Sequence, residues 1–183
     1  MPSSPFICLV RGINVGGRNK VPMADLRAVC GDLGWDNVQT YIQSGNIIAR
    51  AAGRPAELEA ELERAIRSRF GIPAAVVARS TQRWLEYIDQ NPYPEASRSH
   101  PNLVMLALSK AAPIKGAGAA LLERATAGEK VAQVDDALWI HYAGGAGRSK
   151  LAGGVVDRLV GSPVTTRNWR TVLKLGELAG AAA

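Results

Sequence analysis

Residues 5–20 read PFICLVRGINVGGRNK, and their pattern sets the expectation for the start of the chain. Five successive apolar residues, 6–10, have the length of a buried strand, and the glycines that follow them mark a loop. Pro22 suits the first turn of a helix, and the apolar positions of residues 26–33 share one helical face up to Gly34, a typical helix stop. The chain is therefore predicted to begin with a strand, a glycine-rich loop and a helix.

The same reasoning extends to the next segments. Strands predicted at 38–43 and 46–50 flank Ser44-Gly45, a pair typical of a tight hairpin. A second helix is predicted from Pro55, with acids early and arginines late as the helix dipole favours, and a strand follows at 74–78. The order strand, helix, strand, strand, helix, strand predicts a ferredoxin-like (split βαβ) arrangement. Three cations are expected on the solvated face of the second helix: Arg64, Arg67 and Arg69.

The rest of the chain predicts a second half of the same kind after a connecting helix at 81–90 and a proline-containing linker at 91–94. The predicted fold class is α+β, with two ferredoxin-like halves packed closely together, a first half at 1–80 and a second at 81–183. The segments predicted in the second half are a strand at 103–108, a helix at 114–124, a hairpin of strands at 130–134 and 137–142 around Asp135-Asp136, a helix with Leu151, Val155, Leu159 and Val160 on one side, a strand at 163–165 and a final helix from Asn168.

One fragment of the form G-R-[NS]-K-apolar occurs twice, at 17–21 and at 147–151, each time between a predicted strand and a predicted helix. Glycines at such a junction let successive backbone N–H groups point into one concavity, and a helix N-terminus adds partial positive charge. Both loops are therefore predicted to bind an anion. Neither is a P-loop, because the G-x-x-x-x-G-K-[ST] pattern is missing. The formal charges at these loops come from Arg18, Lys20, Arg148 and Lys150.

The charge composition points the same way. The 183 residues include 22 Lys and Arg against 16 Asp and Glu, a net charge of +6, and 16 of the 22 cations are arginine. Arginine grips phosphate and carboxylate groups in a bidentate manner. Residues 141–174 hold six basic residues and one acid, and residues 5–20 hold three basic residues and no acid. The excess charge is therefore concentrated around the two loops.

Several classes of protein are disfavoured. Cys8 and Cys30 lie in apolar stretches without C-x-x-C spacing, which argues against zinc and disulfides and favours a reducing compartment. The apolar run 6–10 is too short for a signal peptide or a membrane span, so a soluble cytoplasmic protein without a membrane partner is expected. His100 and His141 have no spaced acid or nucleophile for a triad. Asp135-Asp136 is read as a turn former and not as a metal site.

Longer motifs resemble a known family. LVRGINVGGRNKVPM (9–23), YIQSGN (41–46), NPY (91–93), GRSKL (147–151) and TRNW (166–169) are similar to the bacterial domain-of-unknown-function 1697 family. The resemblance implies an intracellular α+β protein with two ferredoxin-like halves, and it implies no activity. Two departures are Tyr93, where phenylalanine is common, and Arg170, where asparagine often stands. The recurrent polar positions fall on Arg11, Asn14, Asn19, Lys20, Gln43, Ser44, Asn46, Arg148, Ser149, Lys150, Arg167 and Asn168.

The leading hypothesis is a site for a phosphorylated or otherwise anionic ligand, where the two loops and the cationic junction at 166–171 converge. Nucleotide or nucleic acid suits the isoelectric point near 9.7, although no aromatic pair of the kind that an RNA-recognition sheet uses is evident. Trp169 is expected to stack on a ring, and Asn14, Ser149 and Asn168 to donate hydrogen bonds. The predicted ligand-binding residues are Arg11, Asn14, Arg18, Asn19, Lys20, Ser44, Asn46, Arg148, Ser149, Lys150, Arg167, Asn168 and Trp169.

Two alternatives stay open. One is an enzyme acting on a small phosphorylated or carboxylated metabolite, with Tyr41 or Ser149 as the proton-transfer partner. The other is a structural role, in which the motifs brace the two halves, Ser149 and Asn168 cap helices and Trp169 belongs to the core. No cofactor, metal requirement or oligomeric state follows from the sequence.

Overall fold

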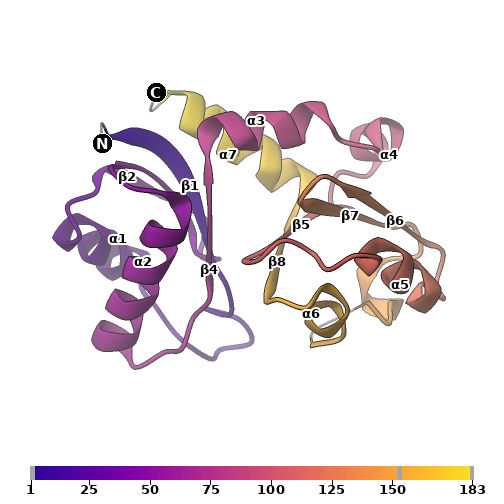
Figure 1. The fold of residues 1–183 in the computed structure, drawn as a ribbon, viewed down its shortest axis with the longest axis horizontal. Helices are drawn as coiled ribbons and strands as arrows, with labels where there is room; N and C mark the ends of the chain where they lie inside the picture. The colour runs from indigo at the N-terminus through magenta and orange to yellow at the C-terminus, as the bar shows by residue number, and fades with distance from the viewer. Residues whose placement is uncertain (1–2, 152–153, 182–183) are drawn as a thin grey trace. The chain divides into compact units, whose positions relative to one another are not determined.

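A computed structural model describes residues 3–151 and 154–181. The described chain forms two four-stranded antiparallel sheets, each accompanied by helices, which confirms the predicted α+β class with two ferredoxin-like halves (Figure 1). By compactness the chain divides into unit 1, Met1–Glu86 with Leu175–Ala183, and unit 2, Tyr87–Lys174. The domain boundary after residue 80 stays a prediction.

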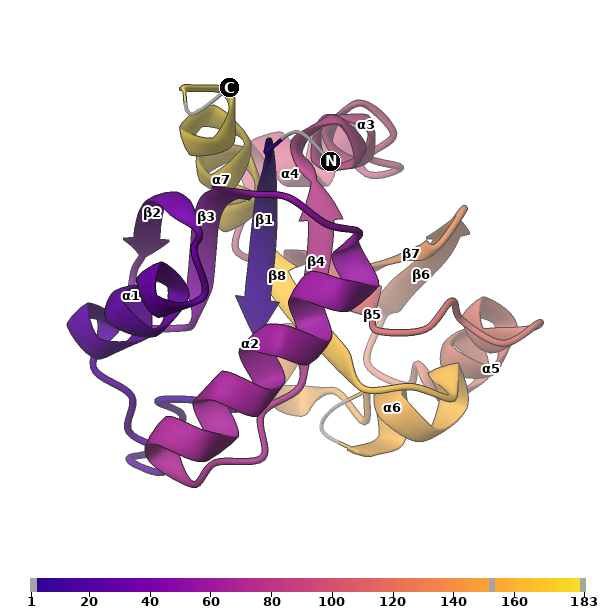
Figure 2. The ribbon, with the colours of Figure 1, turned by 60° about the vertical axis from the view of Figure 1, so that its left-hand side comes forward.

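Unit 1 has the split βαβ order, and its strands pair in the order β2-β3-β1-β4 with every neighbour antiparallel. Both helices α1 and α2 lie on one face of this sheet (Figure 2). The elements are β1 (Ser4–Val10), α1 (Met23–Asp32), β2 (Asp36–Tyr41), β3 (Asn46–Ala51), α2 (Pro55–Phe70), β4 (Val76–Ser80) and the start of α3 (Thr81–Asp89).

The apolar run in β1 is buried on both faces of the sheet. Phe6, Cys8 and Val10 belong to the core beneath the helices, and Ile7 and Leu9 on the opposite face are buried as well. Burial on both faces explains why the run is continuous and does not alternate. Burial also raises the pKa of Cys8 and raises that of Cys30 to about 12. Both thiols therefore stay protonated at neutral pH, a state in which they are poor nucleophiles.

The edge strand β4 is covered by two glutamates one turn apart on α2. Glu63 Oε1 accepts a hydrogen bond from Val76 N–H (2.9 Å), and Glu59 Oε1 accepts one from Ala78 N–H (2.8 Å). Arg79 Nη1 lies 3.7 Å from Glu59 Oε1 and donates to the Ala78 carbonyl (2.8 Å). These side chains occupy backbone groups that would otherwise be open to pairing with another strand.

The second and third strands of unit 1 are joined differently from the prediction. The two-residue hairpin at Ser44-Gly45 is wrong: β2 ends at Tyr41, and a four-residue turn, 42–45, precedes β3. Ile42 and Gly45 have positive φ angles of 50° and 71° in this turn. The buried Asn46 side chain closes it by donating to the Tyr41 carbonyl (3.0 Å) and to Ser44 Oγ (2.9 Å). The strand predicted at 74–78 is also displaced, to Val76–Ser80.

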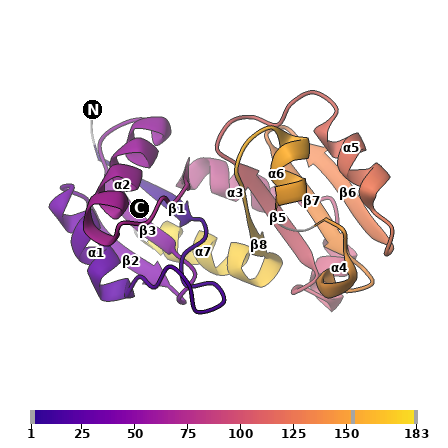
Figure 3. The same ribbon diagram turned by 90° about the horizontal axis from the view of Figure 1, so that it is seen from below.

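Unit 2 repeats the topology. Its strand order, β6-β7-β5-β8, places the second, third, first and fourth strands of the unit as in unit 1. Figure 3 shows α5 and α6 together beside this sheet. The elements are the end of α3, α4 (Pro94–Ser99), β5 (Val104–Ser109), α5 (Ala117–Arg124), β6 (Glu129–Val134), β7 (Ala137–Tyr142), the 3₁₀ turn η1 (Ala146–Arg148), α6 (Gly154–Val160), β8 (Val164–Asn168) and the start of α7 (Trp169–Ala181).

Three predictions in unit 2 are corrected. The linker at 91–94 runs into an unpredicted helix, α4, which Pro94 opens as its first residue. The helix predicted to have Leu151, Val155, Leu159 and Val160 on one side is described as α6 from Gly154 to Val160; its buried residues are Val156 and Val160, and Val155 is half-exposed. Leu151 is buried outside the helix. The strand predicted at 163–165 continues to Asn168, so Thr166 and Arg167 lie in β8 and not at a helix start.

Candidate functional site

The glycine-rich loop of unit 1 folds into a small hairpin before the chain reaches α1. Arg18 N–H donates to the Val15 carbonyl (3.0 Å), and Asn14 N–H donates to the Asn19 carbonyl (3.0 Å). Gly16 and Gly17, at the tip, have φ angles of 57° and 75°, which suits glycine. The hairpin projects beyond the strands of the unit (Figure 3). Its amides at residues 14 and 18 are therefore engaged within the loop.

Asparagine side chains hold this hairpin in place. The Asn14 amide donates to the carbonyl oxygens of Val21 and Gln43 (both 2.9 Å), and its Oδ1 accepts from Val21 N–H (2.8 Å). The Asn19 amide donates to the Gly12 carbonyl (2.8 Å). Together with Asn46 and Ser44 in the adjacent turn, these groups bond to the loops themselves. The structure thus gives four of the predicted ligand-binding residues a local folding role.

The cations of the same loop face solvent. Arg18 and Lys20 are exposed, and within residues 3–151 and 154–181 neither makes an ion pair. Arg11, at the end of β1, is partly buried and has an interaction partner. The loop therefore separates its polar residues into amides that brace it and cations that point outward.

The glycine-rich loop of unit 2 is braced by Ser149. Its hydroxyl donates to Glu129 Oε1 and accepts from Leu151 N–H (3.0 Å), while Glu129 Oε2 accepts from Ala127 N–H (2.7 Å). Ser149 ends the turn η1 and does not cap α6, which corrects the cap interpretation. Tyr142 OH donates to the Leu151 carbonyl (3.0 Å), so the residues around the motif's serine are tied to β6 and β7.

The hydrogen bond from Ser149 is the main cause that lowers the pKa of Glu129 below its usual range. We expect Ser149→Ala to raise this pKa, because the carboxylate loses the donor that favours its charged form. A carboxyl group whose pKa is lowered in the folded state stabilises the fold at a pH above its unfolded pKa. This stabilisation is lost as the pH falls through the folded-state pKa. Stability of the variant should therefore depend less on pH in the acid range.

Titration of the Glu129 carboxyl carbon by NMR checks this expectation, with urea unfolding followed from neutral to acid pH. Ser68→Ala, at an exposed serine of α2, is the matched control and should change neither quantity. An unaltered Glu129 pKa in Ser149→Ala would show that this hydrogen bond is not what lowers it.

The repeated fragment has the same internal division in both units. Its apolar fifth residue, Val21 or Leu151, is buried to 1% and 2% exposure. Its third residue, Asn19 or Ser149, bonds to neighbouring chain. The cations on either side of that third residue are all exposed, and none has an ion pair among the described residues: Arg18, Lys20, Arg148 and Lys150.

The junction of β8 and α7 carries three predicted site residues. Arg167 lies opposite Leu106 in the sheet and donates from Nη1 to Thr165 Oγ1 and to the Thr166 carbonyl (both 2.8 Å). Burial lowers its pKa to about 10, so it stays charged at neutral pH. Asn168 Oδ1 accepts from Thr171 N–H (2.9 Å) and caps α7, as the structural alternative anticipates.

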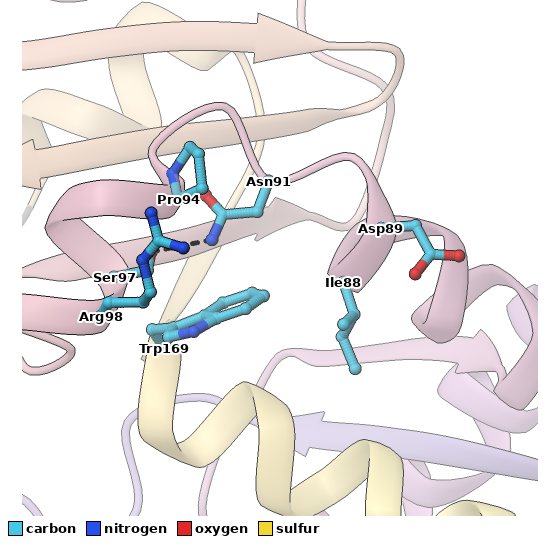
Figure 4. A pocket seen from close by; sticks show the side chains of 7 residues that line it. All are labelled: Ile88, Asp89, Asn91, Pro94, Ser97, Arg98 and Trp169. Carbon is cyan, nitrogen blue, oxygen red and sulfur yellow. Dashed lines mark hydrogen bonds between the residues drawn. The ribbon is translucent and has the colours of Figure 1, made fainter.

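Trp169 borders a pocket of about 230 Å³ within unit 2 (Figure 4). The indole is only partly buried, and its ring centroid lies 5.8 Å from that of the fully buried Trp139. Sequence reasoning missed the other walls of the pocket, although the NPY motif at 91–93 marks one of them. The lining residues are Ile88, Asp89, Asn91, Pro94, Ser97, Arg98 and Trp169.

Comparison with known proteins supplies the family. A family model described as a protein of unknown function (DUF1697) matches residues 4–139. The chain belongs to this family. A solved structure described as a conserved bacterial protein, SP0830 from Streptococcus pneumoniae, is similar to this DUF1697 chain with a TM-score of 0.72 and 23% identity, over 97% of this chain and 99% of that one. At that identity the likeness concerns the fold alone. No curated protein matches the chain.

The predicted site of this DUF1697 protein is distributed over both units. Residues 12–20 belong to unit 1, and residues 144–150 and 166–169 belong to unit 2. Convergence of the three segments on one ligand stays a prediction. Each segment has its own geometry: an exposed cation pair on each loop, and a capped junction beside the Trp169 pocket.

Histidines and acids of the described chain are arranged as follows. His100 Nδ1 lies 3.0 Å from Ser99 Oγ, and the ring of His141 packs 5.9 Å from that of Tyr93, while burial lowers the pKa of His141. Both carboxylate oxygens of Asp136 accept from Tyr87 OH (2.9 Å). Residues 3–151 and 154–181 hold no group of three or more metal-ligating side chains, and none of their helices combines the length and apolar character needed to cross a bilayer.

Proposed function

We propose that the protein binds a polyanion, with the phosphate backbone of a nucleic acid as the ligand class, through the cations of its two glycine-rich loops. The observation that carries this proposal is that the residues of the repeated fragment have two separate roles. In both loops the polar third residue holds the loop, and the arginine and lysine beside it are exposed without an ion pair among the described residues.

Exposed cations that no acid neutralises favour an anionic partner. Each loop contributes one arginine and one lysine, and the chain as a whole carries a net charge of +6. Phosphate contacts from such side chains release counterions from nucleic acid, which makes binding strongly salt-dependent. Small anions are usually held in concave sites that enclose them. Cations on a projecting loop are better placed to contact the phosphates of an extended nucleic-acid backbone.

The proposal is tested by fluorescence anisotropy with a labelled oligonucleotide in low salt. We expect Arg18→Ala/Lys20→Ala and Arg148→Ala/Lys150→Ala each to weaken binding by about tenfold, the loss expected for two exposed charge contacts. The folds should be retained, because the four side chains bond to nothing in the described chain.

A charge-matched control removes two exposed arginines of α2, Arg64→Ala/Arg67→Ala. This variant has the same net charge as either loop variant and should bind as the wild type does. Equal weakening in all three variants would show that net charge alone causes the loss of binding and that the loops have no special role. Wild-type protein that fails to bind any oligonucleotide would refute the proposal. Competition by inorganic phosphate at low millimolar concentration would favour a small phosphorylated ligand.

A further inference from the structure

We infer that the Trp169 pocket of unit 2 binds a planar heteroaromatic ring that carries a phosphate group. Such a ligand has two sources, a free mononucleotide or an unpaired base of a single strand. The inference goes beyond the loop cations, because the pocket is built from α3, α4 and the start of α7, and none of the four loop cations lines it.

The ring-binding surface is the indole of Trp169. Of the four tryptophans, all within the described chain, Trp35, Trp84 and Trp139 are exposed by 5%, 0% and 0%, and only Trp169 is partly open. The ring is held against Trp139, and the backbone N–H of Trp169 donates to the Pro101 carbonyl (3.1 Å). A held, half-open indole offers a face on which a nucleobase stacks regardless of its sequence.

The size of the pocket limits the ligand to one ring system. Its volume of about 230 Å³ lies below the range of about 300–1,000 Å³ that is typical of pockets for drug-sized ligands. Ile88 and Pro94 line the pocket as well and supply apolar contact. A flat ring with a polar edge fits such a lining, because its faces meet carbon and its edge meets the polar rim.

The polar rim is positioned by α4 and the turn before it. Asn91 donates from Nδ2 to Ser97 Oγ (2.7 Å), and its Oδ1 accepts from Tyr93 N–H (2.9 Å). An amide has two N–H donors and two lone pairs on oxygen, so one of each is left by these two bonds. Figure 4 shows the Asn91 amide above the Trp169 ring, with a dashed line for its hydrogen bond to Ser97. Asn91 is thereby oriented to read the edge of a bound ring.

Arg98 is the group for the phosphate. Its guanidinium lies on the Asn91 side of the indole in Figure 4, and it forms an ion pair with Glu95 in which both side chains are largely exposed. Surface pairs of this kind contribute little, so exchange of Glu95 for a phosphate is favourable. Asp89, the acid in the lining, has its carboxylate turned away from Trp169 in the same view.

The test is a titration of the intrinsic tryptophan fluorescence of the full chain with AMP, UMP, adenosine and inorganic phosphate. We expect saturable quenching by both mononucleotides, weaker binding of adenosine and no quenching by phosphate. Trp169→Phe should abolish the response, because the three remaining tryptophans are buried. A short single-stranded oligonucleotide that binds at least tenfold more tightly than UMP would identify the strand as the source, and equal or weaker binding would identify the mononucleotide.

Arg98→Ala keeps the test decisive even where a change at Trp169 disturbs folding, since Arg98 is exposed. We expect this variant to weaken AMP binding about tenfold and to leave adenosine binding unchanged. Arg124→Ala, an exposed arginine at the end of α5 in the same unit, is the matched control. The inference is overturned if AMP does not quench at millimolar concentration, or if the two arginine variants respond alike. Removal of all four loop cations should leave AMP binding intact, which separates this site from the proposed function.

Discussion

Replacing Glu59 by alanine is expected to lower the free energy of unfolding by about 3–5 kcal/mol, the range for breaking a buried ion pair from one side. The Glu59 and Arg79 side chains are only 5% and 14% exposed, and Glu59 Oε1 also accepts the Ala78 N–H. The variant leaves a largely buried guanidinium without this carboxylate and an edge-strand amide without its acceptor. Urea or thermal unfolding measures the loss.

Two comparisons make this prediction specific. Glu59→Gln keeps an oxygen for Ala78 N–H and removes only the charge, so its loss should be intermediate. Glu61→Ala, two residues away on the same helix and half-exposed, should change the stability by no more than about 0.5 kcal/mol. A loss below about 1 kcal/mol in Glu59→Ala would contradict the stabilising role of the covered edge.

Gly45→Ala is expected to cost about 2–5 kcal/mol, because two effects add at this position. Its φ of 71° lies in the left-handed region, where a side chain costs about 1–2 kcal/mol. An added Cβ would also lie 2.8 Å from Ile13 Cδ1 and 2.9 Å from both Cβ and the backbone oxygen of Val10. Overpacking of this kind costs typically about 1–3 kcal/mol, and the backbone of β1 cannot move aside easily.

Gly71 provides the matched control. It ends α2 with a φ of 69°, and an added Cβ would meet nothing within 4 Å. Gly71→Ala should therefore show the conformational cost alone, and the difference between the two variants measures the close approach of the turn to β1. Equal losses in thermal unfolding would mean that the turn gives way without cost.

The order of elements was predictable because local patterns determine it. The continuous run 6–10 correctly predicted a strand, which the structure shows to be buried on both faces, and the pattern from Pro55 correctly predicted the helix α2. The prediction failed where side-chain hydrogen bonds to the nearby backbone override the signal of the residue pattern. Ser44-Gly45 looks like a two-residue turn, but the Asn46 amide reaches back to Tyr41 and closes a four-residue one. Leu151 looks helical, but Ser149 takes its N–H.

The candidate site was predictable in its charges and not in the roles of its amides. The concentration of cations near residues 18, 20, 148 and 150 is visible in the sequence, and exposure of all four follows in the structure. Asn14 donates hydrogen bonds to Val21 and Gln43, which lie 7 and 29 residues further along the chain. A local sequence pattern does not predict such partners. The Trp169 pocket likewise joins α3 and α4 to a helix some 70 residues later, so only the fold brings its walls together.

The salt dependence of oligonucleotide binding bears most directly on the proposed loops. Single-strand affinity falls with a log-log slope of about 0.7 per phosphate contact, so the wild type should have a slope steeper by about 2.8 than a variant with Arg18, Lys20, Arg148 and Lys150 all changed to alanine. That result would assign four phosphate contacts to the two loops. Identical slopes for the two proteins would show that the loop cations do not contact the strand, and would contradict the proposed function.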